Sequence, residues 1–250
     1  MLECSRAYPD CAGRWAMAPE LISRRALLAA AAGTLLLPQR LLSAAAARDD
    51  WETFIVGMCR LAASHADGVA SEKAVAVHGT QLLQQLNVSN AGFADAVSAA
   101  YETGNRFWLW QRLTREPVLN GGILTVARGR DVPLHDHPAA TGLLRVLAGE
   151  LEVWQFDRLP ANGSQPYHGL AELQRVSHRV LRPGDTAVLS PAHGNIHALR
   201  ARSSECSMLD YFIPPYRRST RTWYEPLGAD WTAAERITCR DIPEAEFYAS

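Results

Sequence analysis

The chain has 250 residues, of which 48% are hydrophobic, and a formal net charge of −1 at pH 7. These values are typical of a globular chain of one domain with enough apolar residues to bury a core. The near balance of charge provides no basic face, which argues against nucleic acid as a partner.

The N-terminal residues contain a candidate export signal. The pair Arg24–Arg25 precedes an apolar run over 26–37, and small residues at 44–47 suit a cleavage site. This arrangement resembles a twin-arginine signal, so we expect residues 1–47 to direct export to the periplasm, with Met17 as an alternative start. The apolar run is shorter than the roughly 20 residues that span a bilayer, so no stable membrane anchor is expected. The alternative is an alanine-rich N-terminus without signal function, which would leave the protein in the cytoplasm.

Residues 48–104 are expected to form a helical segment. Their apolar residues recur at intervals of three and four, and Ser71 and Ser89 are candidate N-caps. His65 and His78 have no partner at the spacing of metal ligands, so we interpret both as structural.

The pattern changes after Asn105 to short runs rich in β-branched, aromatic and leucine residues, separated by turn residues. This spacing is typical of an all-β sandwich or barrel, so the predicted fold is mainly β with a helical N-terminal layer. His168 lies in a polar loop, and His178 lies in a strand where it could face either way. The predicted strands are 107–113, 122–128, 132–137, 142–149, 150–157, 172–181, 185–191, 195–202 and 206–214.

The cysteines do not form a recognisable site. Removal of the signal would leave Cys59, Cys206 and Cys239, an odd set without a C-x-x-C spacing. This argues against both a disulfide framework and a zinc cluster.

Two histidines, His135 and His137, lie one residue apart in a predicted strand. Residues i and i+2 of a strand lie on the same face, so both imidazoles point the same way and Asp136 points away from them. A single histidine is more often a hydrogen-bonded structural residue than a ligand. The pair is therefore half of a metal site only if another part of the chain supplies a third donor.

The surrounding glycines resemble the motifs of the cupin family. Gly129, the His135–His137 pair and the turn at Gly149 match the first motif, and the block that ends in Gly194-x-x-His197 matches the second more loosely. The resemblance implies a jelly-roll β-barrel over residues 105–250, with His197 as the third metal ligand. His193, four residues earlier, is the alternative third ligand.

One departure from the cupin pattern changes the expected charge of the site. Most metal cupins carry a glutamate four or five residues after the second histidine, where this chain has Thr141 and Gly142. The expected donor set is then three neutral imidazoles, and a divalent iron would keep its full charge of +2 and attract an anionic substrate.

Three blocks in order resemble the thiol dioxygenases of the cysteamine dioxygenase and plant cysteine oxidase type. They are P-L-H-D-H-P at 133–138, G-N-x-H at 194–197 and L-D-x-x-x-P-P-Y at 209–216, and the resemblance covers roughly residues 105–224. It implies one Fe(II) held by His135, His137 and His197, with O2 as co-substrate. The group oxidised would be the sulfur of a small aminothiol or of a peptide with an N-terminal cysteine, and the product a sulfinic acid.

The same resemblance implies roles for Asp210 and Tyr216. Asp210 would orient a metal-bound histidine or a substrate amine, and Tyr216 would donate a hydrogen bond near the bound oxygen or substrate. The structural alternatives are a strand-end cap for Asp210 and packing at the barrel mouth for Tyr216.

Two family features are absent from this chain. Where many relatives have Cys-x-Tyr the chain has Thr222-Trp223-Tyr224, so no thioether crosslink is expected there, and the methionine usual after H-D-H-P-G is replaced. The leading hypothesis is therefore an exported Fe(II)-dependent thiol dioxygenase, with a motif set compatible with a monomer. The alternatives are a cupin module that binds a metal or ligand without turnover, and a cupin oxygenase of a non-thiol substrate.

Overall fold

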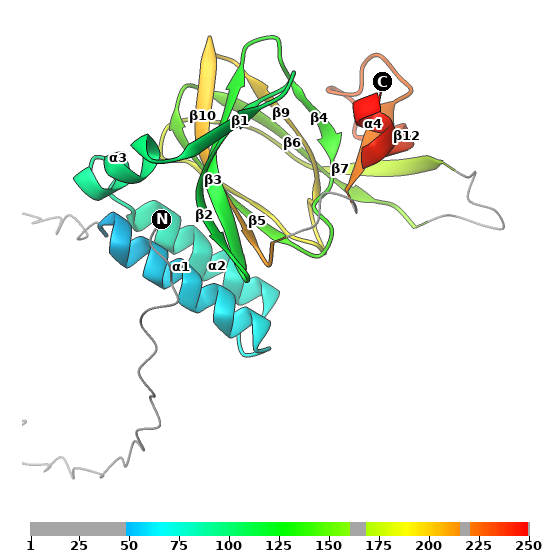
Figure 1. Cartoon of the computed structure of the whole chain (residues 1–250). Coiled ribbons are helices and arrows are strands. Elements are labelled where there is room, and N and C mark those ends of the chain that lie inside the picture. The colour runs from blue at the N-terminus through cyan, green and yellow to red at the C-terminus, as the bar shows by residue number, and fades with distance from the viewer. Residues whose placement is uncertain (1–48, 161–168, 216–220, 250) are drawn as a thin grey trace, which may run out of the picture. The chain divides into compact units, whose positions relative to one another are not determined.

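The computed structural model describes residues 49–160, 169–215 and 221–249. The predicted export signal, His168 and Tyr216 lie outside these residues. Within them the chain folds into N-terminal helices, two β-layers and a short C-terminal helix (Figure 1). None of the described helices is long and apolar enough to cross a membrane.

Three N-terminal helices, α1 (Trp51–Ala66), α2 (Glu72–Gln85) and α3 (Ala91–Ser98), precede the first strand. Ser71 caps α2 as predicted, because its side chain accepts a hydrogen bond from the backbone N–H of Ala74. The prediction for Ser89 was wrong: Asn90 is the N-cap of α3 and accepts from the backbone N–H of Gly92 at 2.8 Å.

Twelve strands follow within the described residues, and all nine predicted strands are among them with shifted ends. The first, β1 (Tyr101–Gly104), falls in the segment that was expected to be helical. The others are β2 (Leu109–Glu116), β3 (Leu119–Ala127), β4 (Val132–His135), β5 (Thr141–Ala148), β6 (Leu151–Arg158), β7 (Leu170–Leu181), β8 (Thr186–Leu189), β9 (Ile196–Ala201), β10 (Glu205–Ile213), β11 (Thr222–Pro226) and β12 (Arg236–Pro243), before α4 (Glu244–Ala249).

The strands form two layers. One is a six-stranded sheet in the order β1-β2-β3-β10-β5-β8, and the other contains β11-β12-β7-β6-β9-β4 and closes on itself because β11 pairs with β4. Gly149 makes the tight turn between β5 and β6 with a φ of +78°, as its place in the motif predicted. The predicted fold class, a mainly β, cupin-type barrel with a helical N-terminal layer, is confirmed.

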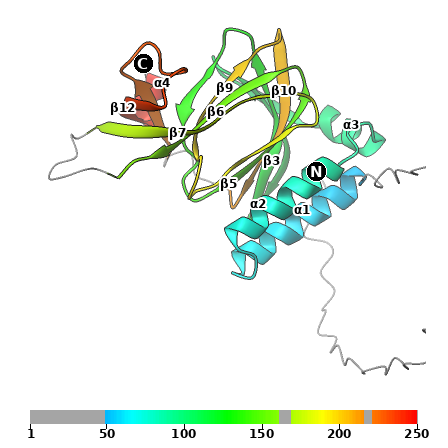
Figure 2. The same ribbon diagram turned by 180° about the vertical axis from the view of Figure 1, so that it is seen from behind.

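Alternation along the strands gives the six-stranded sheet two apolar faces. On β10, Leu209 and Tyr211 pack in the same core as Phe54 of α1 and Leu83 of α2. The neighbouring residue Met208 packs in a second core with side chains of the other layer. Figures 1 and 2 show the helices against one side of this sheet and α4 on the far side of the molecule. The even-numbered residues of β10 therefore face the inside of the barrel.

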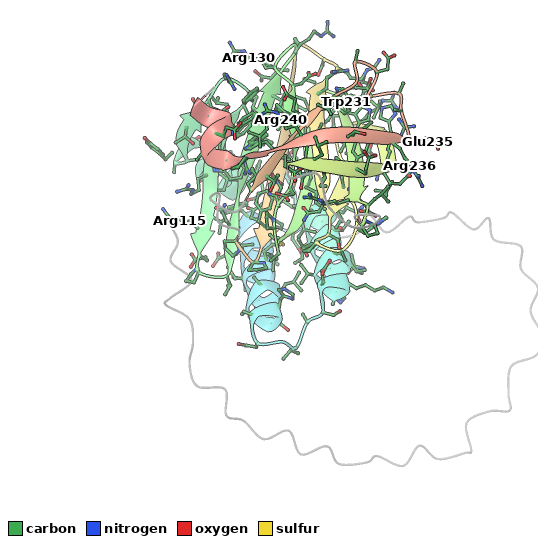
Figure 3. The ribbon with its side chains drawn as sticks, turned by 90° about the vertical axis from the view of Figure 1, so that its right-hand side faces the viewer. Arg115, Arg130, Trp231, Glu235, Arg236 and Arg240 are labelled. Atoms are coloured by element: carbon green, nitrogen blue, oxygen red, sulfur yellow. The ribbon has the colours of Figure 1, made fainter. Side chains whose placement is uncertain are left out.

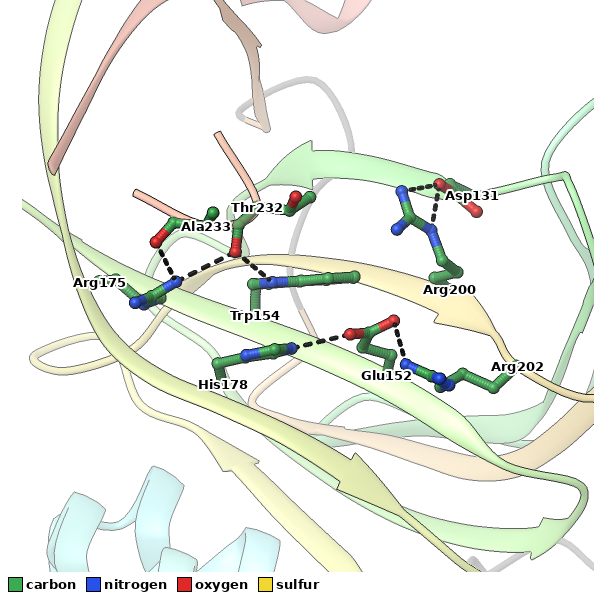
Figure 4. Close-up of polar contacts among 9 residues, drawn as sticks. All are labelled: Asp131, Glu152, Trp154, Arg175, His178, Arg200, Arg202, Thr232 and Ala233. Carbon is green, nitrogen blue, oxygen red and sulfur yellow. Dashed lines mark hydrogen bonds and ion pairs between the residues drawn. The ribbon is translucent and has the colours of Figure 1, made fainter. Parts of the chain in front are cut away.

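The outer face of the second layer is covered by the connection between β11 and β12. Trp154 Nε1 donates to the carbonyl of Thr232 at 3.2 Å, and Arg175 donates to the same oxygen at 3.0 Å (Figure 4). His178 lies here too, stacked on Trp154 with a centroid distance of 5.0 Å and bonded to Glu152 at 2.9 Å. His178 is thus a structural residue outside the barrel.

Candidate metal centre

Three imidazoles meet inside the barrel, from two adjacent strands. His135 ends β4 and pairs in register with His197 of β9, while His137 follows two residues after His135. All three side chains are buried, and one nitrogen from each lies within 4.8 Å of the other two. The structure therefore brings together the three residues that the sequence motifs selected.

Hydrogen bonds fix the orientation of two of the rings. His135 Nδ1 contacts the carbonyl of Pro133 at 2.9 Å, and His197 Nδ1 contacts the carbonyl of Asn195 at 2.9 Å. A carbonyl only accepts, so each Nδ1 carries the proton and each Nε2 keeps a lone pair. Two rings therefore present a metal-binding nitrogen toward the centre.

Burial keeps the three imidazoles uncharged. It lowers the pKa of His197 to about 4, although the hydrogen bond to Asn195 opposes this effect. Burial also holds the pKa values of His135 and His137 well below their ordinary value, and nearby positive charge on Arg221 adds to the effect. Metal ions bind neutral imidazole, so this environment keeps the rings ready for an ion.

The donor geometry fits a first-row divalent ion. The Nε2 atoms of His135 and His137 are 2.9 Å apart. Two nitrogen ligands, each about 2.0–2.1 Å from an ion and at a right angle to each other, are separated by roughly this distance. Among the described residues, no carboxylate or thiol joins the group.

The absence of an acidic ligand has a simple structural cause. Thr141 pairs with Ile213, which packs against the helices, so the Thr141 side chain points away from the imidazoles. Gly142 pairs with Phe212 on the inner face but has no side chain. Neither position can supply a carboxylate.

Asp136 and Asn195 hold the backbone around the imidazoles. Asp136 points away from the centre, as predicted, and accepts hydrogen bonds from the backbone N–H of Thr222 at 2.8 Å and from Tyr224 Oη at 3.2 Å. Asn195 binds the backbone N–H of His137 through Oδ1 at 3.0 Å. These contacts tie the ligand-bearing segment to β11 and to the start of β9.

Aromatic rings pack on the faces of two imidazoles. Trp223 lies 4.8 Å from His135 between ring centroids, and Phe212 stacks on His137 at 4.5 Å with an angle of 9° between the planes. The Trp223 Nε1 donates to Glu244 of α4 at 2.6 Å, and its ring stacks on Phe247 at 3.9 Å. The C-terminal helix thus supports one wall of the centre, a role that no pattern in the sequence indicated.

A cavity of about 290 Å³ opens onto the imidazoles. Asp210 lines it together with Phe212, both on the inner face of β10. Burial raises the pKa of Asp210 to about 8, although Arg221, which also lines the cavity, opposes this effect. The carboxyl group of Asp210 therefore holds its proton at neutral pH.

His193 does not belong to the group. Its side chain is 70% exposed, and its Nδ1 bonds to Asp157 at 2.7 Å. His65 and His78 make only local contacts, to the carbonyl of Ala70 and to Gln81. Cys206 and Cys239 are buried free thiols.

A family model described as PCO_ADO matches residues 113–237. The human "2-aminoethanethiol dioxygenase" is 30% identical over 114 residues, which cover 38% of this chain and 42% of the relative. The Arabidopsis thaliana "Plant cysteine oxidase 2" is 31% identical over 86 residues, which cover 34% of this chain and 31% of the relative. The chain thus spans less than half the length of these curated relatives.

Solved structures give more distant similarities. KdgF from Halomonas sp. has 18% identity and a TM-score of 0.36, over 47% of this chain and 91% of that chain. An RmlC-like cupin from Shewanella frigidimarina has 18% identity and a TM-score of 0.36, over 47% of this chain and 86% of that chain.

Proposed function

Because this chain belongs to the PCO_ADO family, we propose that it is an Fe(II)-dependent dioxygenase of a small thiol or of a peptide with an N-terminal cysteine. The reaction is R–SH + O2 → R–SO2H, in which every atom of both reactants ends in the sulfinic acid product. The names of the relatives, a dioxygenase of 2-aminoethanethiol and a cysteine oxidase, support this class of substrate.

The observation that carries the proposal is the set of three buried, neutral imidazoles without a carboxylate. Iron(II), when bound there, supplies the redox chemistry that adds both oxygen atoms to sulfur. Because His135, His137 and His197 contribute no negative charge, they do not repel a thiolate. A free thiol has a pKa of about 8.5, and a positive environment favours its deprotonated form.

Asp210 is proposed to orient a metal-bound histidine or the substrate through a hydrogen bond. Its carboxyl lies on the cavity side of β10 and is 8% exposed, so it is shielded from bulk water. Burial raises its pKa to about 8, so at neutral pH the carboxyl is largely protonated and can donate that hydrogen bond. Tyr216, which follows the Pro214–Pro215 pair in the family motif, is proposed as a hydrogen-bond donor to the substrate.

The direct test is oxygen consumption by the full chain after anaerobic loading with Fe(II). Four thiols are supplied separately: cysteamine, cysteine, 3-mercaptopropionate and a Cys-initiated peptide. The masses of the products are measured by mass spectrometry. At least one thiol is expected to gain two oxygen atoms. The absence of oxygen uptake with every thiol would overturn the proposal.

Two histidine variants separate an enzyme from a metal-binding module. His197→Gln removes one proposed ligand, and His193→Gln changes an exposed histidine outside the group. We expect turnover and metal content to fall together in the first variant and to stay unchanged in the second. A wild-type protein that retains iron without oxidising any thiol would favour the binding module.

A further inference from the structure

A β-bulge places two arginines of β2 on the wall of the cavity. The pairing of β2 with β3 shifts between Arg112 and Thr114. After this shift Arg115 pairs with Asn120, and all three of Arg112, Arg115 and Asn120 line the cavity. Regular alternation would have put Arg112 and Arg115 on opposite faces, so the bulge redirects the second arginine inward.

Arg112 stands in the same cross-strand row as Asp210, with Gly122 between them. Arg112 pairs with Gly122 on β3, which pairs with Asp210 on β10. A Cβ at Gly122 would lie 2.2 Å from the backbone oxygen of Gln111, so this position accepts only glycine. Arg112 and Asp210 therefore face the same side of the sheet, and both line the cavity.

Among the residues that the structure describes, the charged side chains on the cavity wall are mostly positive. Arg112, Arg115 and Arg221 face two acids, Asp210 and Glu116. Asp210 is largely protonated at neutral pH, which weakens its contribution. The three imidazoles are neutral. Arg221 also lies 3.8 Å from Glu244.

We propose that Arg112, assisted by Arg115, binds a carboxylate on the substrate, so that the preferred substrate is a small thiol that also carries a carboxylate. The inference rests on the proposed function. A guanidinium has five donors in a planar fork, and two of them match the two oxygens of a carboxylate even when others are engaged. Arg112 is only partly exposed and one of its nitrogens is buried, so its charge is less screened than a surface charge.

The size of the cavity agrees with a small substrate. At about 290 Å³ it lies at the lower limit of pockets that enclose small molecules. The imidazoles that would face a thiol and the Arg112 side chain that would face a carboxylate line the same cavity.

The test compares thiols that differ only in the carboxylate. We expect kcat/KM to be about 10- to 100-fold higher for 3-mercaptopropionate than for 3-mercaptopropionamide, and for L-cysteine than for L-cysteinamide. Arg112→Met should bring each ratio toward 1, because the acid loses more than the amide. Arg115→Met, at an exposed position, should reduce the ratio by a smaller factor.

Arg130→Met is the matched control, because Arg130 is exposed, is not among the residues that line the cavity, and is labelled at the top of Figure 3, well apart from Arg115. The ratio should stay unchanged in this variant. An equal kcat/KM for acid and amide in the wild-type protein would overturn the inference while leaving the thiol dioxygenase proposal intact.

A binding measurement on the metal-free protein makes the inference independent of turnover. Calorimetry should detect 3-mercaptopropionate binding at least tenfold more tightly than the amide, and the difference should shrink at high salt and in Arg112→Met. Equal affinities would also overturn the inference. If the acid binds preferentially but no thiol is oxidised, the proposed function fails and the carboxylate site stands.

Discussion

Asn195 binds both main-chain polar groups of His137, its N–H and its carbonyl. Its side-chain Oδ1 accepts from the His137 N–H at 3.0 Å, and its Nδ2 donates to the His137 carbonyl at 3.2 Å. Its own carbonyl accepts from Nδ1 of His197 at 2.9 Å. One residue therefore orients two of the three imidazoles.

Asn195→Ala should weaken metal binding more than it weakens the fold. The variant loses both bonds to His137, so we expect metal affinity to fall by about 10- to 100-fold and the free energy of unfolding by about 1–3 kcal/mol. Equilibrium dialysis with limiting metal measures the first, and denaturant titration of the metal-free protein the second. Asn90→Ala, which removes the N-cap of α3, is the control and should cost about 1 kcal/mol without changing metal affinity.

Trp223→Leu should loosen the centre through His135. The variant removes the ring that lies on His135 and the hydrogen bond to Glu244 of α4. We expect a loss of about 3–5 kcal/mol in stability together with weaker metal binding.

The control for this variant is Trp154→Leu. Trp154 is also fully buried and also donates its Nε1–H, but on the outer face of the barrel. Trp154→Leu should lower the free energy of unfolding by a similar amount and leave the metal affinity of the folded protein unchanged. Equal losses of metal affinity in both variants would show that His135 does not depend on Trp223.

Asp210→Asn should change how stability depends on pH. Burial raises the pKa of Asp210 to about 8 from an ordinary 3.8, so the native state binds its proton more tightly than the unfolded state. The stability that this proton provides is fully present below about pH 4 and is lost as the pH rises toward 8. Relative to wild type, the asparagine variant should therefore gain stability between pH 5 and pH 8.5, on the order of a few kcal/mol.

Denaturant titration of the metal-free proteins at these two pH values measures the difference. The slope of the titration should be the same for both proteins, so that the comparison concerns stability alone. Parallel stability curves for wild type and variant would contradict the raised pKa.

Gly122→Ala should disrupt the inner face of the sheet. The added Cβ would meet the backbone oxygen of Gln111 at 2.2 Å, so β2 and β3 must separate locally. We expect a loss of more than about 2 kcal/mol, by the scale of overpacked sites. Gly228→Ala, where an added Cβ meets nothing within 4 Å, is the control and should leave the melting temperature nearly unchanged.

The sequence was sufficient for the parts of the site that follow local rules. His135 and His137 share a face because of strand alternation, and the glycine-bounded block around His197 marked the third imidazole. The exclusion of His193 needed the structure, because only the fold shows it exposed and bonded to Asp157. The assignment of Tyr216 stays a prediction.

Other parts of the site could not be predicted because they depend on irregular or distant contacts. Arg115 lines the cavity because of a β-bulge in β2. The bulge interrupts the regular alternation of side chains, on which a prediction from sequence depends. Asn195 accepts a hydrogen bond from the backbone of His137, which is 58 residues away in the sequence. The hydrogen-bond partner of Trp223 lies in the short C-terminal helix α4. No local pattern encodes such contacts.

The register between β4 and β9 has a kinetic consequence. It joins residues 135 and 197, which come together only when distant parts of the chain have paired. A partly folded chain without this pairing offers an ion two rings at most. Metal should therefore leave the refolding rate almost unchanged and slow the unfolding rate, so that the ion prolongs the lifetime of the native barrel without guiding its formation.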